Sequence, residues 1–133
     1  KHELSELDAS KNITIYYEVD DVRGYLAQSD CLVLPSYREG MPRSILEAMS
    51  MNCPVVATDV PGCSALVNDG INGYLCASKS HITLSSSMEK IMSLSPEDRK
   101  QLGKNGRAII EKKFSVSIVI KSVVDIINEF NNA

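Results

Sequence analysis

The stretch DCLVLPSYREGMPRSILEAMSMNCPVVAT, residues 30–58, decides the fold of this 133-residue chain. It contains two short apolar runs, residues 31–34 and 54–58, which do not alternate apolar with polar side chains. Such runs are typical of parallel strands covered on both faces. A helix over about residues 42–52 is expected between them, because four apolar residues recur at helical spacing: Met41, Ile45, Ala48 and Met49.

The segments on either side continue the alternation of strands and helices along the chain. The β-branched and aromatic run 12–18 predicts another strand, capped at Asp20-Asp21 into a short helix over 21–28. Beyond the deciding stretch the chain predicts the following elements: a short helix over 62–67, a strand over 73–77, and helices over 82–93, 95–114 and 116–130, the second of them open to interruption at Gly103 and Gly106. We therefore expect one α/β domain over residues 1–133, with a Rossmann-like parallel sheet of about four strands, flanking helices and an all-helical C-terminal segment.

Composition narrows the function classes. Fourteen Lys and Arg against seventeen Asp and Glu give a net charge of -3, without the basic excess of a nucleic-acid-binding protein. No apolar run approaches the roughly 20 residues of a membrane span. The four cysteines form no CxxC pair, and only His2 and His81 accompany them. We expect free thiols, a cytoplasmic location and no metal site or cofactor.

The last predicted helix carries an apolar stripe wider than one face. Its Val and Ile residues exceed what a small sheet is expected to cover, so the helix is either deeply buried or reaches for a partner. We expect self-association or a disordered C-terminal segment.

The segment 35–49 carries the candidate chemistry. It follows a predicted parallel strand and runs into a helix, and ligands of open α/β sheets bind at that edge. A helix start offers unpaired N–H groups to a phosphate, and Gly40 lets a ligand approach the backbone. Glu39 would precede the helix and Glu47 would lie about two turns into it, roughly 12 Å further along the axis at a rise of about 1.5 Å per residue. Two acceptors at that separation could hold two sugar rings of one extended ligand.

Local stability explains the same residues in another way. Ser36-x-x-Glu39 matches a capping box, and Arg43 with Glu47 matches an i,i+4 ion pair. No GxGxxG phosphate fingerprint is present. Both interpretations are open on these residues alone.

Three blocks in order resemble the donor-binding domain of family 4 glycosyltransferases, retaining enzymes of the GT-B fold. They are SYREGMPRSILEAM at 36–49, PVVATDVPG at 54–62 and NDGINGYL at 68–75. The resemblance also takes in residues 30–36 and 107–114, and so covers most of the chain. The Pro-Arg-Ser at 42–44 is similar to a variant found among bacterial capsule and exopolysaccharide transferases, which favours a role in polysaccharide biosynthesis.

The resemblance implies a role for each residue of the motif. Glu39, the catalytic candidate, would face the donor-sugar hydroxyls, and Glu47 would accept hydrogen bonds from the ribose. The donor's sugar and diphosphate would meet backbone N–H groups of the loop and helix start, formed by Gly40, Met41, Arg43 and Ser44. Many members have a second glycine where this chain has Pro42, which offers no N–H.

The resemblance also implies what this chain lacks. The family's Arg and Lys pair on the diphosphate is not found upstream of residue 12, where only Lys1 and Lys11 occur, and the acceptor-binding domain is missing. We expect a C-terminal portion that supplies part of a nucleotide-sugar site, with a uridine donor, and that binds donor weakly and transfers nothing alone. A glycan or lipid-linked acceptor, and peripheral association of the full-length enzyme with the inner face of the membrane, are the expected partners.

Two alternatives stay open. A GT-B sugar-nucleotide epimerase would hydrolyse or invert a UDP-sugar without an acceptor. A flavodoxin-like interaction module would not respond to nucleotides, and substitution of Glu47 would change little.

Overall fold

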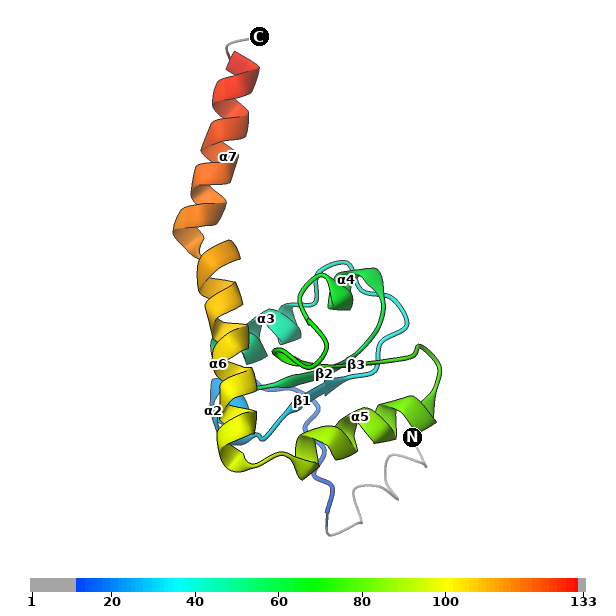
Figure 1. The fold of residues 1–133 in the computed structure, drawn as a ribbon. Helices are drawn as coiled ribbons and strands as arrows, with labels where there is room; N and C mark the ends of the chain where they lie inside the picture. The colour runs from blue at the N-terminus through cyan, green and yellow to red at the C-terminus, as the bar shows by residue number, and fades with distance from the viewer. Residues whose placement is uncertain (1–11, 132–133) are drawn as a thin grey trace.

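The computed structural model describes residues 12–131, which form an α/β domain with a long C-terminal helix (Figure 1). The strands are β1 (Leu32–Leu34), β2 (Val55–Thr58) and β3 (Gly73–Cys76). They form one parallel sheet in the order β1-β2-β3, with Val33 opposite Val56 and Val56 opposite Tyr74. The helices are α2 (Arg23–Gln28), α3 (Arg43–Ser50), α4 (Pro61–Ser64), α5 (His81–Ser93), α6 (Pro96–Lys113) and α7 (Val116–Asn131).

Helices cover both faces of the sheet. In Figure 1, α3 and α4 lie on one face and α5 lies on the other. Alternate residues of β2 divide accordingly: Val55 and Ala57 pack with the α3 and α4 residues, and Val56 packs with Ile91 of α5. All four residues of β2 are buried, as the continuous apolar run predicted.

One predicted strand is wrong. Residues 12–18 run without strand hydrogen bonds, so the described sheet has three strands rather than about four. The β-branched run has strand propensity, but a strand is stable only with a hydrogen-bonded neighbour, and no strand within residues 12–131 pairs with it. The helix that follows begins later than expected. Its N-cap is Val22 rather than Asp20 or Asp21, and no side chain caps it, although the Asp21 carboxylate accepts the Arg23 N–H at 2.9 Å.

Helix α6 closes the amino end of the sheet. Ser95 accepts the Asp98 N–H at 3.1 Å and Pro96 takes the first helical position, as the sequence predicted. The helix continues through Gly103 and Gly106 without interruption. A Cβ at Gly103 would lie 1.8 Å from the Asn52 carbonyl oxygen, so this glycine lets α6 pack directly against the chain entering β2.

A buried asparagine organises the loop before β3. Asn72 is fully buried, accepts the Asn68 N–H at 2.7 Å and donates to the Leu66 carbonyl at 3.0 Å. Asp69 accepts the Leu75 N–H at 2.8 Å. A buried polar group that lost its hydrogen-bond partner here would cost about 1–3 kcal/mol of stability. The NDGINGYL block therefore builds the loop and fixes β3.

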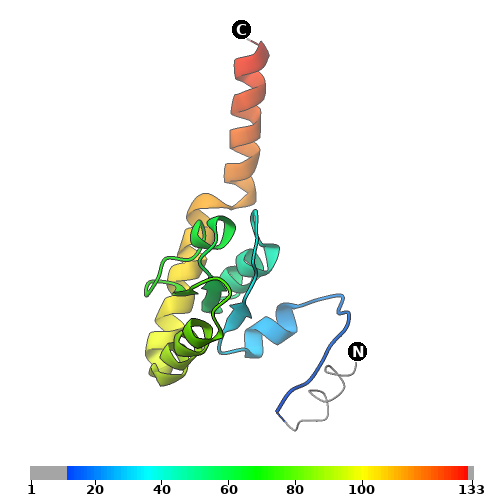
Figure 2. The same ribbon diagram turned by 90° about the vertical axis from the view of Figure 1, so that its right-hand side faces the viewer.

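Helix α7 extends beyond the domain, continuing the direction of α6 (Figures 1 and 2). It is helical through Asn131 rather than disordered, and no residue of it is buried. Its apolar stripe is exposed to solvent, and these side chains form it: Val116, Ile120, Val123, Ile127 and Phe130. No helix within residues 12–131 has the length and apolarity needed to cross a membrane.

The four cysteines are free, as predicted, and three of them are buried. Burial raises the pKa of the Cys31 thiol to about 12 and also raises the pKa of Cys53. Within residues 12–131 no group of three or more His, Cys, Asp and Glu side chains is placed to hold a metal ion.

Candidate functional site

The carboxyl edge of the sheet carries the loop between β1 and α3. This loop contains Glu39 and Gly40, which line a cavity of about 560 Å³ together with Tyr37, Arg38, Val60 and Pro61. Val60 and Pro61 follow β2, so the cavity lies between the ends of two adjacent parallel strands. This is the place where open α/β sheets bind their ligands.

Gly62 fixes the position of the Glu39 loop. A Cβ at Gly62 would lie 2.3 Å from the Glu39 carbonyl oxygen and 2.4 Å from the Gly40 carbonyl oxygen. Those distances are far below van der Waals contact, so only glycine permits this approach of α4 to the loop. The PVVATDVPG block thus supports the candidate catalytic residue through the backbone.

The start of α3 is open to a ligand. Its N-cap is the buried Pro42, which makes no side-chain cap, and no acidic residue occupies the first turn. The first N–H groups of a helix have no intrahelical acceptor, and here those of Arg43 and Ser44 find no partner among the described residues. These donors and the helix dipole favour an anion.

The capping-box interpretation of Ser36 and Glu39 is wrong. Helix α3 begins at Arg43, so both residues lie in the preceding loop, and neither caps it. Pro42 forces this late start, because proline disfavours a helical conformation in the residue before it. Glu39 lies before α3 and Glu47 lies within it, as the sequence predicted.

The ion-pair interpretation of Arg43 and Glu47 is confirmed. Arg43 Nη2 lies 3.7 Å from Glu47 Oε1, with 89% and 43% of the two side chains exposed. An exposed i,i+4 pair contributes only about 0.3–0.5 kcal/mol. The pair therefore leaves Glu47 free to exchange its partner for a ligand hydroxyl.

The structure brings some of the candidate residues together and not others. Glu39 and Gly40 share the cavity, whereas Met41, Arg43, Ser44 and Glu47 do not line it. Met41 is 54% exposed on the loop that connects the cavity to α3. The two parts are continuous in the chain, so an extended ligand could pass from the cavity to the first turns of α3.

Sequence reasoning missed Tyr37 and Val60 as cavity residues. The only sequence signal for Val60 is its place directly after a buried strand; Asp59 and the Pro61-Gly62 turn share that place, which predicts a supporting contact to the ligand. Pro61 does line the cavity, and Asp59 does not. Tyr37 has no such signal, because its role depends on the fold of the whole sheet edge.

The pKa of the buried Cys63 thiol depends in part on Glu39. Burial raises the pKa of the Cys63 thiol, and the carboxylate of Glu39 and the thiol of Cys76 act in the same direction. The Cys63 thiol is therefore kept protonated behind the Glu39 loop.

Comparison with known proteins identifies the family of the chain. Residues 1–109 match the family model described as "Glycosyl transferases group 1". The chain is 27% identical over 124 residues to the capsular polysaccharide biosynthesis glycosyltransferase CapM of Staphylococcus aureus, covering 93% of this chain and 32% of that protein. It is 35% identical over 115 residues to an uncharacterized glycosyltransferase of Methanocaldococcus jannaschii, covering 85% of this chain and 32% of that protein.

Solved structures share the fold. HepE of Anabaena, in complex with UDP-glucose, superposes with a TM-score of 0.85 at 22% identity, over 96% of this chain and 35% of HepE. This chain spans about a third of the length of the curated relatives that it matches. On the family match, the chain belongs to the group 1 glycosyl transferases.

Proposed function

We propose that this chain is the C-terminal, donor-binding part of a retaining glycosyltransferase that uses a nucleotide-sugar, with UDP as the nucleotide, in polysaccharide biosynthesis. The observation that carries the proposal is the joint position of Glu39, Gly40 and the uncapped start of α3 at one edge of a parallel sheet. The CapM relative is named for capsular polysaccharide biosynthesis, and the HepE structure contains UDP-glucose. The first name supports a role in polysaccharide biosynthesis, and the second supports a UDP-sugar as the donor.

In this proposal Glu39 is the catalytic residue that meets the donor sugar. Its carboxylate lines the cavity and accepts hydrogen bonds from sugar hydroxyls, which are stronger than neutral hydrogen bonds because the acceptor is charged. Gly40 and Met41 present backbone N–H groups beside it. These contacts hold the anomeric carbon in one pose while it gains oxocarbenium character.

The diphosphate and ribose follow along α3. The N–H groups of Arg43 and Ser44 face the diphosphate, whose negative charge grows as the sugar leaves, and the helix dipole stabilises that charge. Glu47 exchanges its weak pairing with Arg43 for the ribose hydroxyls. Pro42 supplies no N–H, so the diphosphate contacts begin at Arg43. The proposal includes no metal or cofactor, since the nucleotide-sugar is a substrate.

The complete enzyme requires parts beyond these residues. The acceptor, a glycan or a lipid-linked glycan, binds to an N-terminal domain, and the upstream part of this domain supplies basic residues to the diphosphate. The complete enzyme works in the cytoplasm, in peripheral contact with the inner face of the membrane. The chain alone is expected to bind donor weakly and to transfer no sugar.

Sugar transfer by the complete enzyme tests the proposal. We expect Glu39→Gln and Glu47→Gln to lower kcat/KM by about a hundredfold, the loss typical when one preorganised polar contact to the transition state is removed. Glu111→Gln is the matched control, because Arg107 and Glu111 form the same i,i+4 pair at 2.7 Å on α6, far along the chain from the loop. Equal activity of all three variants would exclude the assigned roles. Inversion of the UDP-sugar without transfer would identify an epimerase instead.

A further inference from the structure

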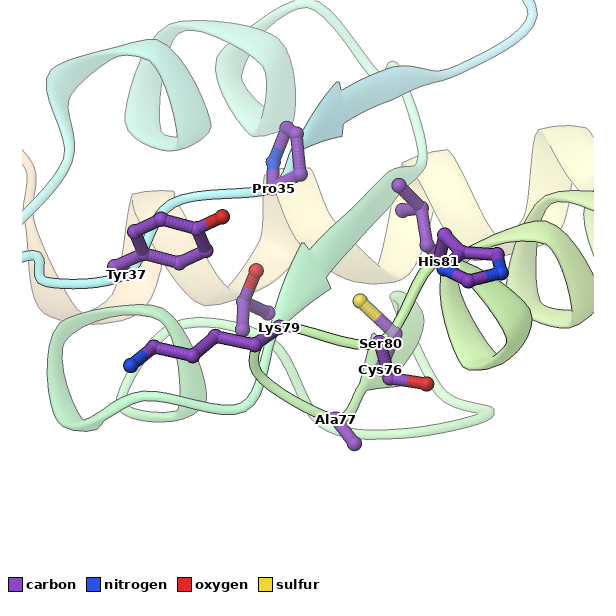
Figure 3. A pocket seen from close by; sticks show the side chains of 9 residues that line it. Pro35, Tyr37, Cys76, Ala77, Lys79, Ser80 and His81 are labelled. Atoms are coloured by element: carbon purple, nitrogen blue, oxygen red, sulfur yellow. The ribbon is translucent and has the colours of Figure 1, made fainter.

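A second cavity lies at the same edge of the sheet, between the ends of β2 and β3. It has a volume of about 340 Å³, and Figure 3 shows the side chains that line it. Thr58 ends β2, Cys76 ends β3, and Ser80 and His81 form the start of α5. None of the donor-binding candidates lines this cavity. Tyr37 lines both cavities and separates them.

Thr58 presents an unused hydroxyl to this cavity. The residue is only 3% exposed and lines the cavity, and its side chain makes no hydrogen bond to any residue within 12–131. No buried side-chain oxygen or nitrogen that is closed off from solvent lacks a partner among the described residues, so the Thr58 hydroxyl opens into the cavity. A nearly buried hydroxyl without a partner is costly unless a ligand or water completes it.

The start of α5 offers further donors. Ser80 caps the helix by accepting the Thr83 N–H at 3.3 Å, which leaves the N–H groups of His81 and Ile82 without an intrahelical acceptor. The helix has 13 residues and no acidic residue in its first turn. Its dipole therefore adds positive potential at the wall of the cavity.

The side chains around the cavity carry only positive or neutral groups. Lys79 Nζ lies 5.8 Å from the centre of the Tyr37 ring, so the ring holds the ammonium at one end of the cavity, and His81 lies at the other end (Figure 3). No Asp or Glu of the described chain lines it. The cavity on the other side of Tyr37 is lined by Glu39 as well as Arg38, so only that cavity includes an acidic residue.

We propose that this cavity binds a phosphate group, held by the Thr58 hydroxyl and the free N–H groups at the start of α5, with the Lys79 ammonium adding positive potential from the other end of the cavity. The site is distinct from the proposed donor site, because the donor's diphosphate is assigned to the start of α3. A phosphate on an acceptor that approaches the Glu39 cavity past Tyr37, and free phosphate, share this chemistry. The inference does not require Glu39 or Glu47 to act as proposed.

Amide chemical shifts of the chain during titration with inorganic phosphate test the inference, at constant pH and ionic strength. We expect saturable shifts at Thr58 and over residues 79–83. Thr58→Val, which removes only the hydroxyl, and Lys79→Gln are each expected to weaken binding about tenfold. Unchanged affinity in both variants would overturn the site. Lys90→Gln is the matched control, because Lys90 stands over Tyr74 at 5.3 Å on α5 and does not line the cavity.

Further experiments distinguish this cavity from the start of α6 and from the donor site, and they identify the source of the phosphate group. The start of α6 also has a serine cap, so equal phosphate shifts at Glu97 and Asp98 would show non-specific binding and overturn the proposal. Shifts that persist in the presence of UDP and in Glu47→Gln support a separate site, and displacement of phosphate by UDP would assign the cavity to the donor. Tighter binding of dimethylallyl diphosphate than of inorganic diphosphate identifies a lipid-linked acceptor as the source, and equal binding identifies the free anion.

Discussion

Gly62 shows how a single position can control the site without touching a ligand. Its missing side chain lets α4 approach the carbonyl groups of Glu39 and Gly40. Ser36 and Glu39, by contrast, satisfy a sequence pattern for helix capping that the fold does not use, because Pro42 delays the start of α3. Close backbone approach decides the geometry of this loop.

Gly62→Ala tests this role. The added Cβ must displace the Glu39 loop, so we expect a loss of about 1–3 kcal/mol in the free energy of unfolding and weaker donor binding. Urea denaturation and a UDP titration measure the two effects. Gly24→Ala is the control, since nothing lies within 4 Å of its Cβ and alanine favours the helix. Native donor affinity in Gly62→Ala would contradict the supporting role.

Cys31 makes the stability of the fold depend on alkaline pH. Burial raises its thiol pKa to about 12 from an ordinary value of 9.0, and Cys53 and Asp30 add to the effect. Below about pH 9 the thiol is protonated in both states. Between pH 9 and 12 only the unfolded chain loses the proton, so stability falls as pH rises.

Urea denaturation of the native chain and Cys31→Ala at pH 8, 9 and 10 measures this effect. We expect the native chain to lose more stability per pH unit above pH 9 than the variant does. The excess is at most about 1.4 kcal/mol per pH unit, because a single proton is involved, and the partial exposure of Cys31 lowers it further. Parallel pH profiles would show that the Cys31 thiol does not keep its proton.

At the scale of elements, the sheet and helices were largely predictable. The continuous apolar runs at β1 and β2 and the Ser95-Pro96 helix start depend on local chemistry, and the structure confirms each of them. Residues 12–18 were not predictable, because a strand also requires a hydrogen-bonded neighbour. Gly103 is a helix breaker by propensity, and its packing on Asn52 reverses that expectation.

Helix α7 exposes an apolar surface of the kind that binds a partner. Its apolar residues recur at alternate spacings of four and three, and between 51% and 81% of each is exposed: Val116, Ile120, Val123, Ile127 and Phe130. This period is that of a coiled-coil seam. Self-association through α7 therefore remains our prediction.

Sedimentation of the chain over a range of concentrations tests that prediction. We expect a mass that rises with concentration, and a monomer for Ile127→Lys, because a buried ammonium in the seam is unfavourable. Asn128→Lys places the same charge one residue along, off the apolar stripe, and is expected to associate normally. A monomer at every concentration would contradict the prediction.

At the scale of the whole molecule, the candidate site occupies one edge of a sheet in a chain that spans about a third of its relatives' length. The order of the motifs in the sequence was sufficient to predict the family and the loop that carries Glu39. Tyr37 and Thr58 could not be found that way. Both residues line a cavity at one edge of the sheet. That edge forms only when three strands that are separated in the sequence pair in the fold.

The most direct test of the donor site is an amide chemical-shift titration of the chain with UDP, with ADP and GDP as controls. We expect shifts confined to residues 39–47, larger for UDP than for the other nucleotides, and absent in Glu47→Gln. Glu111→Gln should behave as the native chain. Shifts that ignore the loop between β1 and α3, or no shift with any nucleotide after the upstream part of the domain is restored, would contradict the assignment of this edge as a nucleotide-sugar site.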